Sequence, residues 1–375
     1  MSRNKYEERQ AEVAEWLAEA GLDVLVLEDT EGRRCSSVRY LTGLPQDGIL
    51  FIFRNGRTVL SPWDVILAKR TAWASDITAL SEFDRTTEKV LAGILAREGF
   101  SQGSRLELSL ATPYSVFMKL QKACPDVIFS CPEKGIEAKI KERRALKDPE
   151  ELSFLRKAAE ITNEVLVLLE EKFKTGDPVT ELDLAMFIEA EGRQRGAEGT
   201  GFETLAAGPE RSFGIHAFPA YTRGPHATEG LSILDFGFLY QGYTSDVTMT
   251  VARGKLSPKQ EKMINLVQKA YDNAVKQAVP GALIRDICRK VDNTFAVEGF
   301  FMPHSLGHGI GLDAHEAPMV STRADEKAVL QPGMVITIEP GLYAADTGGV
   351  RLENDLLITE NGSELLTRSR ILRLS

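Results

Sequence analysis

The segment 233–248 reads ILDFGFLYQGYTSDVT, and its two apolar runs flank the pair Gln241-Gly242. Two apolar runs around a short glycine-containing pair are typical of a β-hairpin. With the turn at this pair, Tyr240 is expected to oppose Tyr243 across the hairpin. The segment therefore predicts two antiparallel strands joined by a tight turn.

Two aspartates of this hairpin are predicted to lie on one face. In the same register Asp235 opposes Thr248, and Asp246 stands two positions before Thr248. Side chains two positions apart share a face, so the two carboxylates sit diagonally, with backbones roughly 7 to 8 Å apart. Like charges so placed repel each other unless a cation lies between them. The alternative is a solvated face that carries two unrelated aspartates.

Three later motifs add groups of the same kind. Glu339 ends the apolar run of MVITIEPG, Glu353 lies in VRLEND, and His308 lies in HSLGHGIG, where glycines let other groups approach the backbone closely. Alternatively, Glu353 pairs with Arg351 on one strand face, and His308 caps a turn. Taken together, two Asp, two Glu and one His form an oxygen-rich set whose four negative charges would balance two divalent cations.

The remainder of the second half mixes helices with hairpins. Asp148-Pro149 is expected to begin a long helix that ends before Gly176, and Thr180 with Asp183 and then Ser257 are expected to begin two more. Such a mixture favours an α+β arrangement over a doubly wound parallel sheet. All five histidines of the chain fall in this half, at positions 216, 226, 304, 308 and 315.

The first third of the chain alternates helix and strand and contains no histidine. Helical apolar spacing over 5–20 ends at Gly21 and is followed by the strand-like DVLVL at 23–27. Asn55-Gly56 lies between two apolar runs and predicts a second hairpin. We place no chemistry in this region and interpret it as a scaffold or a subunit-contact domain.

Length and composition limit the classes of protein and partner. A chain of 375 residues is about twice the usual length of one domain, and the charged stretch 133–147 predicts a boundary between domains 1–135 and 136–375. The net charge of -9 argues against a nucleic-acid partner. No apolar run approaches the roughly 20 residues that span a bilayer, so no membrane association is expected. Scattered cysteines and a charged N-terminal stretch without an apolar core predict a cytoplasmic location.

The ordered series LDFG, SDVT, HSLGHGIG, HEAP, TIEPG and VRLEND resembles the prolidase and aminopeptidase P branch (M24B) of the pita-bread metallopeptidases. RYLTGL at 39–44 is similar to a segment of the creatinase-type N-terminal domain of that branch. The resemblance implies a creatinase-type N-terminal α/β domain followed by a pita-bread catalytic domain. It also implies a homodimeric peptidase that removes an N-terminal residue preceding proline. Two divalent ions are implied, with manganese expected and cobalt, zinc and iron as alternatives.

The resemblance also implies a role for each metal-site residue. Asp235 would chelate one ion, while Asp246 and Glu353 would bridge both. His308 and Glu339 would complete the shell of the second ion. Glu339 would in addition take a proton from the attacking water and pass it to the proline nitrogen.

Four further residues are implied on the substrate side. His216 and His315 resemble histidines that hydrogen-bond the charge developing on the substrate, and with Glu339 they form the predicted catalytic set. His304 matches a histidine of the substrate pocket. Arg351 matches a group that orients the nearby ligands, with an ion pair to Glu353 as the alternative.

The sequence departs from the family pattern at several positions. Met319 follows HEAP where several prolidases carry an arginine, and Met249 replaces a frequent arginine of the SDxTRT pattern. Since a dipeptide carboxylate needs a cationic partner, both a dipeptidase and an aminopeptidase of longer peptides stay open. The segment 216–235 is slightly longer than usual, and His226 within it is interpreted as a loop residue. Two other classes stay as alternatives: a metal-free creatinase-like amidinohydrolase and a non-catalytic pita-bread binding protein.

Overall fold

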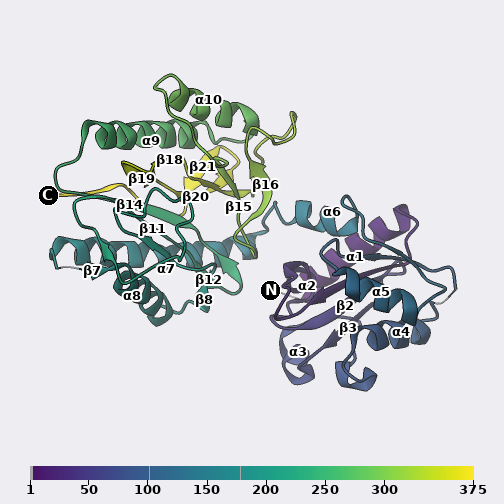
Figure 1. The fold of residues 1–375 in the computed structure, drawn as a ribbon. Coiled ribbons are helices and arrows are strands. Elements are labelled where there is room, and N and C mark those ends of the chain that lie inside the picture. Colours follow the sequence, from purple (N-terminus) through teal and green to yellow (C-terminus); the bar gives the residue numbers. More distant parts are fainter. Residues whose placement is uncertain (1–2, 101, 178) are drawn as a thin grey trace. The chain divides into compact units, whose positions relative to one another are not determined.

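The computed structural model describes residues 3–100, 102–177 and 179–375, and the chain divides into two compact units, Met1–Arg143 and Arg144–Ser375 (Figure 1). Helix α6 (Ile136–Arg143) packs against α1 and α2 of the first unit, so the units divide after this helix. The predicted boundary after residue 135 lies before it, within the same charged stretch.

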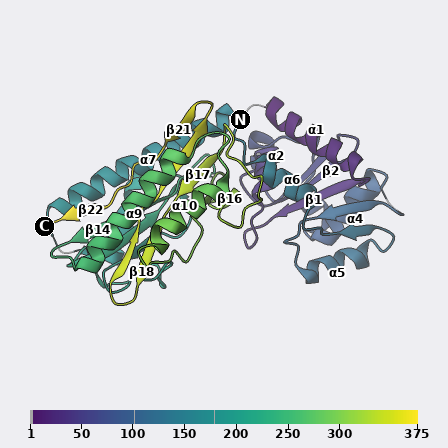
Figure 2. The ribbon, with the colours of Figure 1, turned by 90° about the horizontal axis from the view of Figure 1, so that it is seen from above.

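The first unit is built on a six-stranded sheet with strand order β4-β3-β2-β1-β5-β6. β1, β2 and β3 are antiparallel neighbours, whereas β5, β6 and β4 join in parallel. Figure 2 shows α1 and α2 on one face and α4 and α5 on the other. The strands are β1 (Val24–Asp29), β2 (Gly48–Phe53), β3 (Thr58–Pro62), β4 (Asp76–Ile77), β5 (Arg105–Leu108) and β6 (Ile128–Ser130). The other helices are α1 (Arg3–Glu19), α2 (Ser36–Thr42), α3 (Val65–Thr71), α4 (Thr87–Arg97), α5 (Tyr114–Ala123) and the 3-10 helix η1 (Leu80–Phe83).

The local predictions for this unit are confirmed. α1 is followed by Gly21 at a φ of 64°, and DVLVL forms most of β1. β2 and β3 pair on either side of Gly56, which has a φ of 84° that favours glycine. Apolar side chains of these strands, α4 and α5 form one core, which makes the unit an α/β layer structure.

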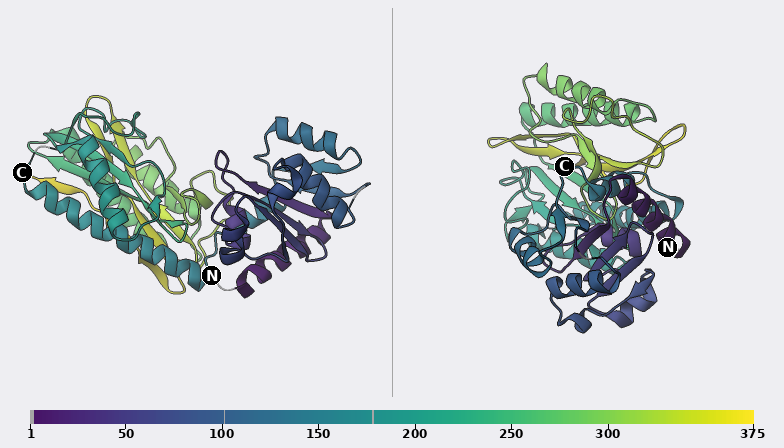
Figure 3. Two further views of the ribbon diagram at one scale, coloured as in Figure 1. Left: turned by 90° about the horizontal axis from the view of Figure 1, so that it is seen from below. Right: turned by 90° about the vertical axis from the view of Figure 1, so that its right-hand side faces the viewer.

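The second unit places strands between two pairs of helices. In Figure 1, and again in the right-hand view of Figure 3, α9 and α10 cover one side and α7 and α8 the other. The helices are α7 (Pro149–Lys174), α8 (Glu181–Gln194), α9 (Pro258–Gln277) and α10 (Ile284–Ala296). One main sheet has the order β22-β14-β11-β9 and the other β16-β15-β17-β20-β21. This arrangement confirms the α+β prediction.

The strands of these two sheets and the short strands beside them complete the unit. The main sheets contain β9 (Leu205–Ala207), β11 (Gly230–Phe236), β14 (Val247–Arg253), β15 (Gly307–Gly309), β16 (Glu316–Val320), β17 (Val335–Ile338), β20 (Asn354–Thr359), β21 (Gly362–Leu365) and β22 (Leu372–Leu374). The shorter pairings use β7 (Val179–Thr180), β8 (Gly199–Thr200), β10 (Pro225–His226), β12 (Phe238–Tyr240), β13 (Tyr243–Thr244), β18 (Gly341–Ala344) and β19 (Gly348–Arg351).

Helix caps in this unit follow the sequence. Asp148, Thr180 and Ser257 each accept a hydrogen bond from backbone N–H groups of the first helical turn, in capping boxes. The apolar faces of α9 and α10 pack on one strand layer and those of α7 and α8 on the other, in two separate cores. Met249 is fully buried in the second of these cores, which explains an apolar residue at that position.

The hairpin register is confirmed, with one interruption. Tyr240 pairs with Tyr243 and Asp235 with Thr248. The ladder breaks at Gly237, where a Cβ would lie 1.8 Å from the backbone oxygen of Ser245. The hairpin therefore divides between two sheets, and Asp246 lies in the break rather than inside a regular strand.

Within the described parts of the chain, every helix is too short or too polar to cross a bilayer.

Candidate metal centre

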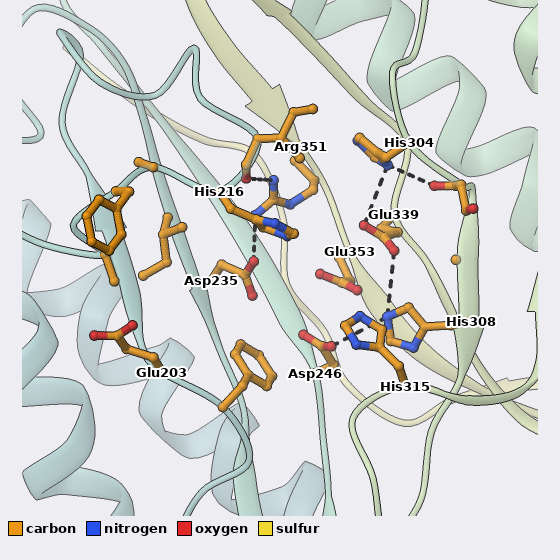
Figure 4. A pocket seen from close by; sticks show the side chains of 18 of the residues that line it. Glu203, His216, Asp235, Asp246, His304, His308, His315, Glu339, Arg351 and Glu353 are labelled. Carbon is orange, nitrogen blue, oxygen red and sulfur yellow. Dashed lines mark hydrogen bonds and ion pairs between the residues drawn. The ribbon is translucent and has the colours of Figure 1, made fainter. Parts of the chain in front are cut away.

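A cavity of about 630 Å3 opens in the second unit, and every site residue predicted from the sequence lines it (Figure 4). These residues are His216, Asp235, Asp246, His304, His308, His315, Glu339, Arg351 and Glu353. They come from five segments that are distant along the chain, 216, 235–246, 304–315, 339 and 351–353, and the fold brings all of them to one cavity.

The four carboxylates lie at or next to strand ends, and His308 lies where the pairing of β15 with β16 shifts register. Asp235 lies near the end of β11, and Asp246 lies just before β14. His308 is in the centre of β15, Glu339 directly follows β17, and Glu353 directly precedes β20. At these positions the regular strand pairing stops. The side chains therefore extend into the cavity and do not pack on a sheet face.

Three of these side chains lie closest together. One donor atom each from Asp246, His308 and Glu353 lies within 4.8 Å of the others, a spacing at which one ion can bind all three. The Nε2 atom of His308 is 3.8 Å from Asp246 Oδ2 and 3.6 Å from Glu339 Oε1. Figure 4 shows these groups turned toward one another.

Asp235 lies in the same cavity but is paired with Arg351. The guanidinium Nη2 donates to Asp235 Oδ2 at 2.5 Å, while Nε donates to Thr248 Oγ1 at 2.8 Å. Among the ion pairs of the described residues, Arg351 pairs with Asp235, and the alternative pair with Glu353 is not formed. The buried guanidinium therefore supplies one positive charge to a group of four carboxylates.

Asp246, Glu339 and Glu353 have raised pKa values. Burial, followed by repulsion from Asp235, raises the pKa of Glu353 to about 7. Burial and repulsion from Glu353 raise the pKa of Asp246 and that of Glu339 well above their usual values. Carboxylates that repel each other in this way are the groups that a divalent cation stabilises.

Three histidines of the cavity have lowered pKa values, which favours their neutral form. Burial lowers the pKa of His308 and that of His304 to about 4, and burial lowers the pKa of His315 as well. The Nδ1–H group of His308 donates to the Gly309 carbonyl at 3.1 Å, which leaves the lone pair on Nε2 facing Asp246 and Glu339. A neutral imidazole oriented by a backbone carbonyl is the usual form of a histidine ligand.

The glycines on either side of His308 are needed for close backbone packing. A Cβ at Gly307 would lie 2.1 Å from the Thr337 carbonyl oxygen, and one at Gly309 would lie 2.0 Å from that of Ala317. Neither site tolerates a side chain without moving the backbone. The prediction that these glycines allow close approach is confirmed.

The donor set fits divalent cations by its chemistry. Four carboxylates and one imidazole, with Arg351 as the buried counter-charge, provide mostly oxygen ligands and one nitrogen. Manganese, cobalt, iron and zinc all accept such mixed sets. The cavity has the excess of negative charge that two such ions would neutralise.

Some residues that support the site were not predicted. Asp355 is buried, and its Oδ2 accepts a hydrogen bond from the backbone N–H of Asp246 at 3.0 Å. Thr248 donates through Oγ1 to Glu353 Oε2 at 2.7 Å. Both stand in motifs quoted from the sequence, and the signal available was a polar residue inside an otherwise apolar strand.

Tyr343 is another residue that sequence reasoning missed. Its hydroxyl accepts from Arg351 Nη1 at 2.8 Å and donates to His304 Nε2 at 3.0 Å, while His304 Nδ1–H donates to the Ser305 carbonyl at 2.8 Å. Arg351 is thereby connected to His304 through one phenol. No distinctive sequence pattern precedes this tyrosine.

The interpretation of His226 as a loop residue is wrong. This residue belongs to β10, is 1% exposed, and stacks on Phe173 at a ring distance of 5.9 Å. Its Nε2 lies 3.4 Å from the Ile233 carbonyl, and burial lowers its pKa to about 4. His226 is a core residue, because β10 pairs with β7 and the ring packs against Phe173 of α7.

Models of known protein families match both units of the chain. Residues 153–360 match the model of metallopeptidase family M24, and residues 9–137 match that of the Creatinase/Prolidase N-terminal domain. The chain belongs to metallopeptidase family M24. This membership confirms the predicted family and the pairing of a creatinase-type domain with a pita-bread catalytic domain. It also makes the chain a metal-dependent peptidase by family.

Individual relatives cover most of the chain. An Xaa-Pro dipeptidase of Pyrococcus horikoshii is 35% identical over 266 residues, which is 70% of this chain and 73% of that protein. The crystal structure of the prolidase from Pyrococcus horikoshii OT3 superposes with a TM-score of 0.84 at 28% identity, covering 97% of this chain and 99% of that one. The structure of an X-Pro aminopeptidase from Thermotoga maritima superposes with a TM-score of 0.83 at 26% identity, covering 98% and 99%.

Proposed function

We propose that this protein is a metal-dependent exopeptidase that removes the N-terminal residue of peptides whose second residue is proline. The observation that carries the proposal is the buried group of carboxylates and one imidazole at the floor of a peptide-sized cavity. Relatives named Xaa-Pro dipeptidase and X-Pro aminopeptidase support this substrate class. They favour it over a metal-free amidinohydrolase and over a non-catalytic binding protein.

In this proposal two divalent ions would be held by five side chains, those of Asp235, Asp246, His308, Glu339 and Glu353. Asp246, His308 and Glu353 already have donor atoms within 4.8 Å of one another. When bound, the ions would lower the pKa of a water molecule to near neutral and polarise the substrate carbonyl.

Glu339 is the proposed proton carrier. Its side chain faces His308 at 3.6 Å and His304 at 3.8 Å, so it lies at the centre of the reacting region. It would accept the proton of the attacking water and deliver it to the departing proline nitrogen. That nitrogen is a tertiary amide without an N–H group, so cleavage requires its protonation.

His216 and His315 are the proposed donors to the substrate carbonyl oxygen, where negative charge develops. Both line the cavity, and the ring of His315 packs 4.1 Å from that of His308. A fixed N–H donor at such a position typically contributes about 10²- to 10³-fold to the rate. Arg351 holds Asp235 and, through Tyr343, His304, which makes it an orienting group.

The cavity walls suit a short apolar peptide segment. Its volume of about 630 Å3 is within the usual range for small-ligand sites. Apolar contacts are offered by Phe202, Leu205, Ile215, Ala217, Phe218 and Ala220. Arg351 is the one guanidinium or ammonium group among the described lining residues, and it is bound to Asp235. This charge balance favours peptides longer than a dipeptide, whose carboxylate lies outside the cavity.

The test is a substrate comparison with the purified protein and added manganese or cobalt. Gly-Pro and Ala-Pro dipeptides are assayed against an Xaa-Pro-Pro tripeptide, and faster release from the tripeptide is expected. Turnover of neither would overturn the proposed function. Hydrolysis of creatine without any bound metal would instead indicate the amidinohydrolase class.

Three finer properties complete the proposal. Manganese is the expected native metal, because oxygen ligands predominate. A homodimer and a cytoplasmic location are expected from the family resemblance and from the four free cysteines. Elemental analysis of protein purified without chelators, light scattering and cell fractionation test these properties one by one.

A further inference from the structure

We propose that Arg144, Lys147 and Glu316 form a buried ion network whose role is to position His315 over the metal centre. The inference rests on the proposed function, since it assigns positioning residues to a proposed donor. With Asp313 these residues are called the linker ion network, because Arg144 and Lys147 come from the stretch that precedes α7.

The contacts of the network converge on one carboxylate. Glu316 accepts from Arg144 Nη2 through Oε1 and from Lys147 Nζ through Oε2, the latter at 3.0 Å. Its Oε1 also accepts from the backbone N–H of Asp313 at 3.0 Å. Arg144 Nη2 further donates to Asp313 Oδ2 at 2.7 Å. Both carboxylate oxygens of Glu316 are therefore held, which fixes the side chain in one orientation.

Three side chains of the network are buried, and the network is balanced in charge. The side chains of Arg144, Lys147 and Glu316 are 3%, 1% and 4% exposed. Although burial acts against ionisation, the charges of Lys147 and Arg144 hold the pKa of Glu316 below its usual value. Two cations face the two carboxylates of Glu316 and Asp313, so no charge is left for a further ligand to neutralise.

The position of the network points to His315. Glu316 is the next residue along the chain, and its side chain fills the space where a Cβ on Gly311 would meet it at 2.6 Å. The Glu316 side chain thus packs against the turn 311–316. The centroid of the His315 ring lies 4.1 Å from that of the His308 ring. Small displacements of Glu316 are transmitted to His315 through a single peptide unit.

The linker side of the network is itself anchored. Lys147 N–H donates to the Gly333 carbonyl at 3.0 Å, and Lys147 Nζ also donates to the Arg144 carbonyl at 2.7 Å. An apolar cluster of the same volume would be as stable as a buried ion network, which is therefore weak evidence for stability alone. Directional bonds add a defined geometry, and geometry is what a substrate-side histidine requires.

The proposal is tested by a double-mutant cycle in metal-loaded enzyme. Glu316→Gln keeps the size of the side chain and removes its charge, and it is expected to lower kcat about 10- to 100-fold with KM nearly unchanged. In a His315→Ala background the same change is expected to cost less than about twofold, since the group that it positions is gone. Equal losses in both backgrounds would overturn the proposal.

Two further variants serve as a substitute and as a control for this test. Asp313→Asn alters the partly exposed arm of the network and serves if Glu316→Gln does not fold; it is expected to lower kcat severalfold, again only when His315 is present. Glu364→Gln is the matched control, because it breaks an ion pair with Arg156 outside the cavity. Unchanged kcat is expected for that control.

A readout without turnover separates this inference from the proposed function. In zinc-loaded protein with 15N-labelled histidine, Glu316→Gln is expected to shift or broaden the ring signals of His315 and to leave those of the buried His226 in place. His315 signals identical to those of the wild type would overturn the inference. Absence of Xaa-Pro turnover in the wild type would overturn the proposed function and leave this result unaffected.

Discussion

Two groups of charged side chains lie near His308 and His315, and they differ in their balance of charge. The linker ion network sets two cations against two carboxylates. The carboxylate cluster, defined as Asp235, Asp246, Glu339 and Glu353, has Arg351 as its buried cation. Most side chains of both groups are buried, so burial alone does not distinguish the two groups.

The direction of the pKa shift does distinguish them. In the linker ion network the neighbouring cations hold the pKa of Glu316 below its usual value in spite of burial. In the carboxylate cluster burial and mutual repulsion raise the pKa of Asp246, Glu339 and Glu353. A balanced group can stabilise a fixed geometry by itself, whereas an unbalanced one indicates a site that is completed by added cations.

The largest effect is expected from changing the cluster at Glu339. Glu339→Gln keeps the shape and removes both the charge and the proposed proton carrier, so kcat/KM is expected to fall about 10²- to 10⁴-fold. The measurement is steady-state hydrolysis of an Xaa-Pro tripeptide, with Glu364→Gln as the matched control. Activity within a factor of two of wild type would remove Glu339 from the mechanism.

A change in the linker ion network is expected to alter the stability of the fold. Lys147→Met leaves a buried carboxylate short of one cation, and this should lower the free energy of unfolding by about 3–5 kcal/mol. Urea unfolding of the metal-free protein measures it. The double variant Lys147→Met with Glu316→Gln should recover part of the loss, and a larger loss than in the single variant would show that the two residues do not act as a pair.

The cluster should make metal binding and pH interdependent. The pKa of Glu353 is raised to about 7 in the folded chain, so the folded state keeps a proton that the unfolded state has already released. Metal-free protein is therefore expected to lose stability as the pH rises from the usual glutamate pKa toward 7. Manganese displaces that proton, so it should raise Tm more at pH 8 than at pH 5. An equal increase at both pH values would contradict this assignment of charge.

The smallest effect is expected from a new positive charge at Met319, which belongs neither to the linker ion network nor to the carboxylate cluster. Met319 lines the cavity and is 52% exposed. Met319→Arg offers a partner to a substrate carboxylate, and a charge-assisted hydrogen bond of about 1.5–3 kcal/mol should raise kcat/KM on Ala-Pro by about tenfold or more. The tripeptide serves as the internal control, because its carboxylate lies farther from the cavity. A parallel increase for both substrates would argue against a carboxylate contact.

Much of the fold followed from local sequence chemistry. The hairpin register at Asp235 and Thr248 came from the position of the Gln241-Gly242 turn, and the helix starts at Asp148 and Ser257 came from capping patterns. These features depend on neighbours within a few residues, so a sequence carries them directly.

The site residues were predicted to converge because their motifs occur in the order of a known family. The residues that surround them could not be predicted in this way. Asp355 and Tyr343 contact Asp246 and His304, which are distant along the chain, so their sequence neighbours do not indicate these contacts. His226 was misread because burial of a histidine is decided by the path of the longer segment around it. The linker ion network joins residues 144 and 316, a pairing that local patterns do not contain.

The most direct test of the charge comparison is an anomalous-scattering map of a crystal grown with manganese. Two peaks are predicted inside the cavity, both within bonding distance of Asp246 and Glu353, and none at the linker ion network. No peak among the cavity carboxylates in excess manganese, or a peak beside Glu316, would contradict the assignment of the unbalanced group as the metal centre.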